Sequence, residues 1–155
     1  MSPWQNLVYN FSRSHLVVLN ERGIFYMYSF EVNSSKKQEF IDITAQVRRI
    51  AEQYGADKKL CVVFIPHTTA AVTINENADP DVKRDIITAL NATIPQRLDY
   101  KHIEGNSPAH IMSSLTGVSE SIIVVNGRLV LGTWQGIYLT EFDGPRTRKV
   151  LVELL

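Results

Sequence analysis

The sequence predicts an α+β fold in which a mainly antiparallel β-sheet sandwich is combined with two to three helices. Three observations predict this class: short β-prone runs bounded by turn residues, separate windows of helical periodicity, and a hairpin signal in the C-terminal half. At 155 residues with 45% hydrophobic content, the chain is expected to form one domain, 1–155, with its own core. Residues 1–22 are interpreted as an N-terminal extension of that domain.

The first half of the chain is expected to contain a strand, a helix and two further strands. An aromatic, β-prone run at 24–32 predicts the first strand, and Thr44 is expected to cap a helix that ends at Gly55. The apolar stripe of that helix is formed by Val47, Ile50, Ala51 and Tyr54. Two apolar runs, 60–65 and about 70–75, predict the further strands because each is short and bounded by turn residues.

Two helices are expected in the middle of the chain. The first is predicted to have Asp79 as its N-cap and Pro80 at its first position, the arrangement that both residues prefer. Its predicted buried face consists of Val82, Ile86, Ala89 and Leu90. The second helix is short, and it is predicted to begin near Ser107 and to stop at Gly117.

The C-terminal part is expected to be rich in strands. Asn126-Gly127 lies between two β-prone runs and is the strongest short signal for a hairpin. The β-prone runs of this part are 121–125, 128–131, 134–142 and 148–154. These strands complete the predicted sheet.

Charge and composition argue against several classes of protein. Lys+Arg and Asp+Glu number 16 each, so the basic excess that is typical of a nucleic-acid binder is absent. No apolar run approaches the roughly 20 residues of a membrane span. Cys61 is the only cysteine, which excludes an internal disulfide and favours a reducing compartment. We therefore expect a cytoplasmic protein with no nucleic-acid or membrane partner.

The segment from Pro66 to Val82 carries most of the candidate chemistry. It places polar side chains at both ends of one short predicted strand, where loops usually carry function. Capping and the helix dipole account for Asp79 and Asp81. They do not account for Glu76, which is flanked by asparagines. The candidates from this segment are His67, Thr68, Thr69, Asn75 and Glu76.

Three of the four histidines, His67, His102 and His110, are expected at the boundaries of helices and strands. Three neutral imidazoles with an open position form a catalytic type of zinc site. Their spacing matches no local zinc signature, and a single histidine is more often a hydrogen-bonded structural residue. The sequence leaves open whether the three side chains meet.

Two further stretches carry candidate binding residues. Gly105, Asn106 and Ser107 precede a helix, so they either form an anion site at its N-terminus or merely cap it. In the second stretch the candidates are Trp134, Gln135 and Arg146, although aromatic residues in a sheet are more often core. The arginines Arg128, Arg146 and Arg148 either bind phosphate or pair with Glu141 and Asp143 at a subunit contact.

Three motifs resemble one known family, the YjbQ-like proteins, which are described as secondary thiamine-phosphate synthases. They read P-H-T-T-A-A-V-T-I-N-E-N-A-D-P-D-V, H-I-E-G-N-S-P-A-H-I and N-G-R-L-V-L-G-T-W-Q-G-I-Y-L-T-E-F-D-G-P-R, and the resemblance runs from about Phe25 to the C-terminus. The chain departs from the family pattern in a short loop between His102 and His110 and at Pro108, where an acidic residue is frequent.

The resemblance implies an α+β sandwich that assembles as a homotrimer, with a polar pocket near the subunit boundaries. It implies a weak transferase that joins hydroxymethylpyrimidine diphosphate to thiazole phosphate and releases pyrophosphate. The residues that match the family motifs are His67, His102, His110, Asn75, Glu76, Asp79, Trp134, Gln135, Glu141 and Arg146.

The leading hypothesis is therefore a transferase that acts on a small phosphorylated metabolite. Its predicted catalytic residues are His67, Glu76 and His110. Its predicted substrate-binding and phosphate-binding residues are Thr68, Thr69, Asn75, Gly105, Asn106, Ser107, Trp134, Gln135 and Arg146. The predicted metal ligands are His67, His102 and His110, with Mg²⁺ expected for turnover and Zn²⁺ as the alternative ion at the histidines.

Two other functions stay open from the sequence. One is a zinc hydrolase in which the three histidines bind the metal and Glu76 is the general base. The other is a trimeric protein that binds a phosphorylated metabolite without turning it over.

Overall fold

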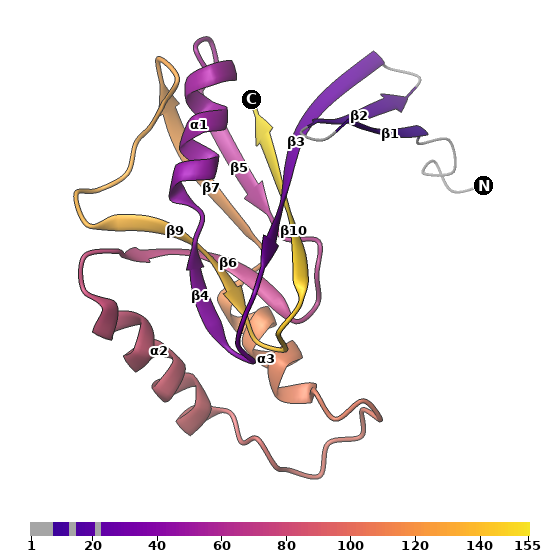
Figure 1. The fold of residues 1–155 in the computed structure, drawn as a ribbon, viewed down its shortest axis with the longest axis vertical. Helices are drawn as coiled ribbons and strands as arrows, with labels where there is room; N and C mark the ends of the chain where they lie inside the picture. Colours follow the sequence, from indigo (N-terminus) through magenta and orange to yellow (C-terminus); the bar gives the residue numbers. More distant parts are fainter. Residues whose placement is uncertain (1–7, 13–14, 21–22) are drawn as a thin grey trace.

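The structure, a computed structural model, describes residues 8–12, 15–20 and 23–155. Two β-sheets and three helices make up the described part of the chain (Figure 1). In chain order these elements are β1 (Val8–Ser12), β2 (His15–Asn20), β3 (Gly23–Asn33), β4 (Glu39–Asp42), α1 (Thr44–Tyr54), β5 (Leu60–Phe64), β6 (Ala70–Glu76), α2 (Pro80–Thr93), α3 (Ser107–Thr116), β7 (Ser119–Val125), β8 (Arg128–Leu129), β9 (Gln135–Glu141) and β10 (Thr147–Leu154).

The strands form a seven-stranded sheet with the order β1-β2-β3-β10-β5-β7-β8 and a three-stranded sheet with the order β4-β9-β6. Neighbouring strands pair antiparallel in both sheets. The predicted α+β class and the antiparallel sandwich are therefore confirmed. None of the helices in the described residues is long and apolar enough to cross a bilayer.

The main core lies between the two sheets and helix α1. Alternate residues of β10 point inward, so that Val150, Val152 and Leu154 are buried, and β9 contributes Ile137 and Leu139 from the other sheet. Helix α1 adds its buried stripe to this core, as the 3.6-residue period predicts. This layer fixes how β9 and β10 lie relative to each other.

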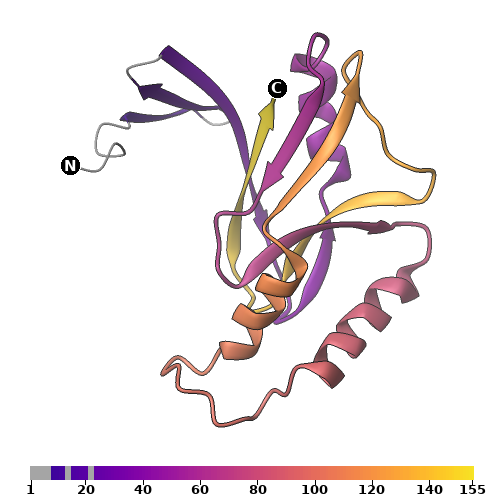
Figure 2. The same cartoon turned by 180° about the vertical axis from the view of Figure 1, so that it is seen from behind.

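The opposite face of the three-stranded sheet is covered by α3 and approached by α2 (Figure 2). A small second core forms there from Ala71, Ile94, Ala109, Met112 and Phe142. The predicted buried face of α2 is only partly confirmed, because Val82, Ile86 and Leu90 are half-buried and Ala89 is exposed. Of these residues, Leu90 packs against the small second core.

Several predicted helix ends are confirmed and one is corrected. Asp79 caps α2, because its side chain accepts a hydrogen bond from the Asp81 N–H at 2.8 Å, and Pro80 is the first helical residue. Thr44 is not an N-cap but the first residue of α1, and its hydroxyl accepts from the Ile137 N–H at 2.8 Å. Helix α3 begins at Ser107 as predicted, and its N-cap is Asn106.

The predicted hairpin at Asn126-Gly127 is confirmed, since β7 and β8 pair on either side of it and both residues have positive φ, 49° and 74°. Two regions of the fold have no counterpart in the sequence predictions. No element was predicted at β4, and β1 with β2 adds a hairpin to one edge of β3. The hairpin reaches away from the rest of the fold in Figure 1.

Candidate functional site

A buried ion pair between Glu141 and Arg148 lies where β9 ends and β10 begins. The Glu141 side chain is fully buried and that of Arg148 is 6% exposed. Arg148 Nη2 donates to Oε1 at 2.6 Å and Nε donates to Oε2 at 2.8 Å, which gives a bidentate contact. The Asp143 N–H and the Ser34 hydroxyl donate to the same carboxylate at 2.8 Å and 3.0 Å. Four donors therefore saturate the Glu141 carboxylate.

This arrangement keeps Glu141 ionised. Burial acts to raise its pKa, but the hydrogen bonds from Arg148 and from the Asp143 N–H outweigh burial and hold the pKa below the ordinary glutamate value of 4.5. The sequence left open whether the arginines bind phosphate or pair with acidic residues. In the structure Arg148 pairs with Glu141, and Arg146 pairs with Asp143 at 2.7 Å, both within one chain.

Thr69 and His67 flank the ion pair. Arg148 Nη2 donates to the Thr69 hydroxyl at 2.8 Å, and the Lys149 N–H donates to His67 Nε2 at 2.8 Å. Burial, followed by the positive charge of Arg148, lowers the pKa of His67. Because Nε2 accepts a hydrogen bond, the neutral imidazole carries its proton on Nδ1 and presents it as a donor. Thr68, the residue between them, is exposed.

The same polar network continues to the N-terminus of α3. Asn106 Nδ2 donates to Asp143 Oδ2 at 3.0 Å, and Arg146 donates to the Asp143 carbonyl and carboxylate at 2.7 Å each. Burial opposes the shift, but the Asn106 hydrogen bond and Arg146 hold the pKa of Asp143 below its ordinary value. Within the described ranges, Asn106 Oδ1 is buried without a hydrogen-bond partner. A carbonyl oxygen there is available to a ligand.

Two imidazoles, those of His102 and His110, lie at the N-terminal end of α3. The His102 and His110 ring centroids are 5.2 Å apart in an edge-to-face arrangement, and His102 Nε2 lies 3.8 Å from Glu104 Oε2. His110 belongs to the first turns of α3, and the positive end of this helix dipole favours an anion. Gly105 has a φ of 74°, which is why a residue without Cβ precedes the helix.

The remaining predicted residues lie at the other end of β6 and β9. Glu76 pairs with Gln135 in the strand register, and the Asn77 N–H donates to the Trp134 carbonyl at 2.7 Å. Trp134 is 64% exposed, and Gln135 Oε1 accepts from the Gly132 N–H at 2.8 Å. Asn75 is exposed and its side chain binds the next backbone N–H. This second cluster is therefore open to solvent.

One strand separates the two clusters. In the register, Ala70 is opposite Glu141 and Glu76 is opposite Gln135, so the clusters are six residues apart along β6. At about 3.3 Å per residue this separation is roughly 20 Å. The prediction that Glu76 shares one site with His67 and His110 is therefore wrong for a single chain. The polar residues at the two ends of this segment are neighbours in sequence only.

The predicted three-histidine metal site is not assembled within one chain. Among the residues that the structure describes, no three His, Cys, Asp or Glu side chains are grouped to hold a metal ion. The structure brings His102 and His110 together, whereas His67 is engaged by the backbone of β10. A single chain offers two of the three proposed ligands, so no chemical step is assigned to a metal here.

The chain was compared with known proteins and solved structures. The family model described as "UPF0047 protein YjbQ-like" matches residues 28–155. The chain belongs to this family. A UPF0047 protein of Methanocaldococcus jannaschii is 45% identical over 129 residues, which cover 83% of this chain and 94% of that protein. The Bacillus subtilis UPF0047 protein YugU is 46% identical over 129 residues, covering 82% and 97%.

Solved structures of the UPF0047/YjbQ family agree with the fold. A Clostridium acetobutylicum member matches with a TM-score of 0.79 and 55% identity, over 82% of this chain and 98% of that one. A Sulfolobus solfataricus member matches with a TM-score of 0.79 and 36% identity, over 83% and 95%. The first is described as uncharacterized and the second as of unknown function. Both clusters of polar residues lie within the matched part of the chain.

The sequence predictions underestimated the part that Glu141, Asp143 and Ser34 play in holding this polar network. One signal was available, since Arg148 occupies an inward position in the alternation that buries Val150 and Val152. A charged residue at such a position requires a buried partner. Ser34 had no comparable signal, because its contact with Glu141 spans 107 residues.

Proposed function

We propose that this UPF0047/YjbQ protein is a transferase that joins hydroxymethylpyrimidine diphosphate to thiazole phosphate and releases pyrophosphate. One observation supports this proposal most: the first turn of α3 gathers groups that suit a phosphate. The His102 and His110 rings lie 5.2 Å apart there, and Arg146 donates to Asp143, whose carboxylate also accepts from Asn106, the N-cap of α3. The positive end of the helix dipole, two imidazoles and a guanidinium together favour an anionic ligand.

Such a transfer requires positioning and charge stabilisation more than a protein nucleophile. In this proposal the α3 N-terminus and Arg146 bind phosphate oxygens. His67 presents its Nδ1–H as a neutral donor, and His110 holds or moves a proton at the substrate. Mg²⁺ enters as the complex of the diphosphate substrate.

The separation of the two clusters along β6 supports a further part of the proposal, that copies of the chain assemble as a homotrimer. Glu76, Asn75, Trp134 and Gln135 of one copy would then face the α3 cluster of another. A third metal ligand for His102 and His110 would also come from another copy. The exposed Trp134 side chain, 64% accessible in the single chain, fits burial at such a contact.

The test is to incubate the protein with both phosphorylated precursors and Mg²⁺ and to follow thiamine phosphate. Wild-type turnover should be lost in His110→Ala and in Glu76→Ala. Lys101→Ala is the matched control, because Lys101 is in the same loop as His102 but its side chain is 84% exposed and pairs with Asp99.

Mixing the two inactive variants tests the shared site. A trimer that has exchanged subunits contains some contacts between an intact α3 cluster and an intact Glu76, so activity should partly return. The absence of turnover in the wild type, or full turnover in His110→Ala, would refute the transferase. Failure of mixing to restore activity would refute only the shared site.

A further inference from the structure

Asn77 is the first residue after β6, and its polar groups reach both other strands of the smaller sheet. Its N–H donates to the Trp134 carbonyl at 2.7 Å, which extends the pairing of β6 with β9 by one step. Its side-chain Nδ2 donates to Asp42 Oδ2 on β4 at 2.8 Å, and its Oδ1 accepts from the Tyr138 hydroxyl on β9. Asn77 therefore connects the ends of β4, β6 and β9.

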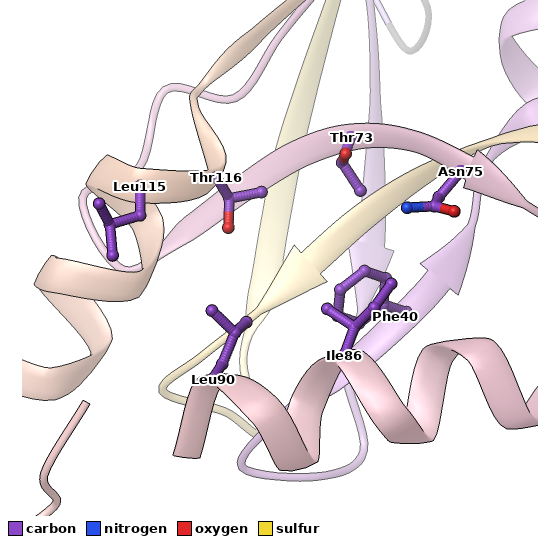
Figure 3. Close-up of a pocket in the computed structure, with 7 residues that line it drawn as sticks. All are labelled: Phe40, Thr73, Asn75, Ile86, Leu90, Leu115 and Thr116. Atoms are coloured by element: carbon purple, nitrogen blue, oxygen red, sulfur yellow. The ribbon is translucent and has the colours of Figure 1, made fainter. Parts of the chain in front are cut away.

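These contacts lie on the face of the three-stranded sheet that α2 approaches. Asn77 continues the alternation of Thr73 and Asn75, which point from β6 toward α2 in Figure 3. On β9, Gly136 leaves the space for the Asn77 side chain, because a Cβ at Gly136 would lie 2.8 Å from Asn77 Nδ2. A glycine inside this strand therefore has a physical reason, the close approach of Asn77.

The groups on either side of the Asn77 amide fix its orientation. Burial acts to raise the pKa of Asp42, but the hydrogen bonds from Thr44 and Asn77 outweigh burial and hold the pKa below its ordinary value, so Asp42 accepts. Burial, and then the negative charges of Asp42 and Glu76, raise the pKa of Tyr138, so its hydroxyl keeps its proton and donates. Only a side chain with one donor and one acceptor satisfies both neighbours.

Two residues of the exposed cluster depend on this arrangement. The Tyr138 hydroxyl also donates to the Glu76 carbonyl at 3.2 Å, while the Asn77 N–H holds the Trp134 carbonyl. The Trp134 side chain is 64% exposed, so packing within the single chain does little to fix it. Hydrogen bonds centred on Asn77 therefore fix the backbone from which Glu76 and Trp134 project.

We infer that Asn77 is a positioning residue for Glu76 and Trp134. It acts through their backbone and does not itself contact the substrate. The inference rests on the proposed function, because Glu76 and Trp134 belong to the proposed transferase site. Misplacement of reacting groups by about 1 Å can lower turnover about a hundredfold. A change at Asn77 should therefore lower turnover although every catalytic group is still present.

The test exchanges the polar groups of Asn77 and Asp42. Asn77→Asp places a second carboxylate against Asp42, and Asp42→Asn brings two amide NH₂ groups together. With both phosphorylated precursors and Mg²⁺, each single variant should lower turnover about tenfold to a hundredfold. The double variant Asp42→Asn/Asn77→Asp again pairs one donor with one acceptor, so it should recover most of the loss.

Asn91→Asp is the matched control. Asn91 lies near the other end of α2, where it exchanges two amide hydrogen bonds with Gln38, at 3.1 Å and 2.7 Å. The substitution removes an amide donor, as Asn77→Asp does, but it places no carboxylate against another. Turnover should stay at the wild-type level.

The indole signal of Trp134 separates positioning from a loss of stability. The chain has two tryptophans, Trp4 and Trp134, so Trp134→Phe assigns the indole N–H signals of the ¹⁵N-labelled protein. The Trp134 signal should shift and broaden in Asn77→Asp and return in the double variant. The melting temperature should change little, because Asp42 and Asn77 are both exposed.

Full turnover in Asn77→Asp, or no recovery in the double variant, would overturn the inference. A loss of turnover that only follows the melting temperature would also overturn it, because Asn77 would then have a structural role alone. No turnover in the wild type would refute the transferase, and the Trp134 signal would still decide about Asn77. An unchanged Trp134 signal in Asn77→Asp overturns the inference whether or not the wild type is active.

Discussion

Replacement of Arg148 by methionine would leave the fully buried Glu141 carboxylate without its counter-ion. The substitution removes two charge-assisted hydrogen bonds to Glu141 and one to Thr69 while keeping most of the side-chain volume. Breaking a buried pair from one side costs about 3–5 kcal/mol. For a chain of this size each kcal/mol lowers the melting temperature by about 2–4 °C, so the expected loss is roughly 6–20 °C.

Urea unfolding at one fixed protein concentration measures this loss, because any self-association changes the apparent stability. Arg84→Met is the matched control: its partner Asp81 and Arg84 itself are 57% and 73% exposed, so the loss there should be below about 1 kcal/mol. The double variant Glu141→Met/Arg148→Met should recover most of the loss, since no unpaired charge remains. Equal losses in Arg148→Met and Arg84→Met would refute the reasoning.

Two other predictions concern residues close to the Glu141–Arg148 ion pair. The pKa of His67, followed by NMR, should lie below 6.5, because burial and then the positive charge of Arg148 disfavour the imidazolium. Since the folded chain has the lower pKa, protonation of the unfolded chain should reduce the stability of the protein as pH falls from about 6.5. A measured pKa above 6.5 would contradict this prediction. Gly144→Ala should destabilise the protein by about 1–3 kcal/mol in urea unfolding, because the new Cβ would lie 2.3 Å from the Lys36 carbonyl oxygen, and unchanged stability would show that this turn readjusts.

The sequence predicted best what short-range periodicity and turn chemistry decide. The stripe of α1, the Asp79 cap and the turn at Asn126-Gly127 depend on residues within one or two turns of one another. The burial of α2 was overestimated for a physical reason: periodicity shows which side of a helix is apolar, but how closely that side is covered depends on strands from distant segments. Ala89 was predicted on the buried face and is exposed.

The candidate site shows the same limit. His67 and Glu76 are nine positions apart in sequence, yet the extended strand between them carries them to opposite ends of a sheet. Conversely, Ser34 and Glu141 are 107 residues apart and meet because β10 pairs with β3 and β4 pairs with β9. Residue types could be predicted from the motifs, whereas their grouping required the register.

The register of β3 also explains where the family resemblance begins. Strand β2 pairs with Gly23–Tyr28 on one edge, and β10 pairs with Tyr28–Asn33 on the other, so Tyr28 is the residue at which one partner succeeds the other. The family match starts at this same residue, 28. The hairpin ahead of it therefore pairs with a part of β3 that β10 does not use, apart from Tyr28 itself, so we expect its removal to leave β10 and Arg148 in place.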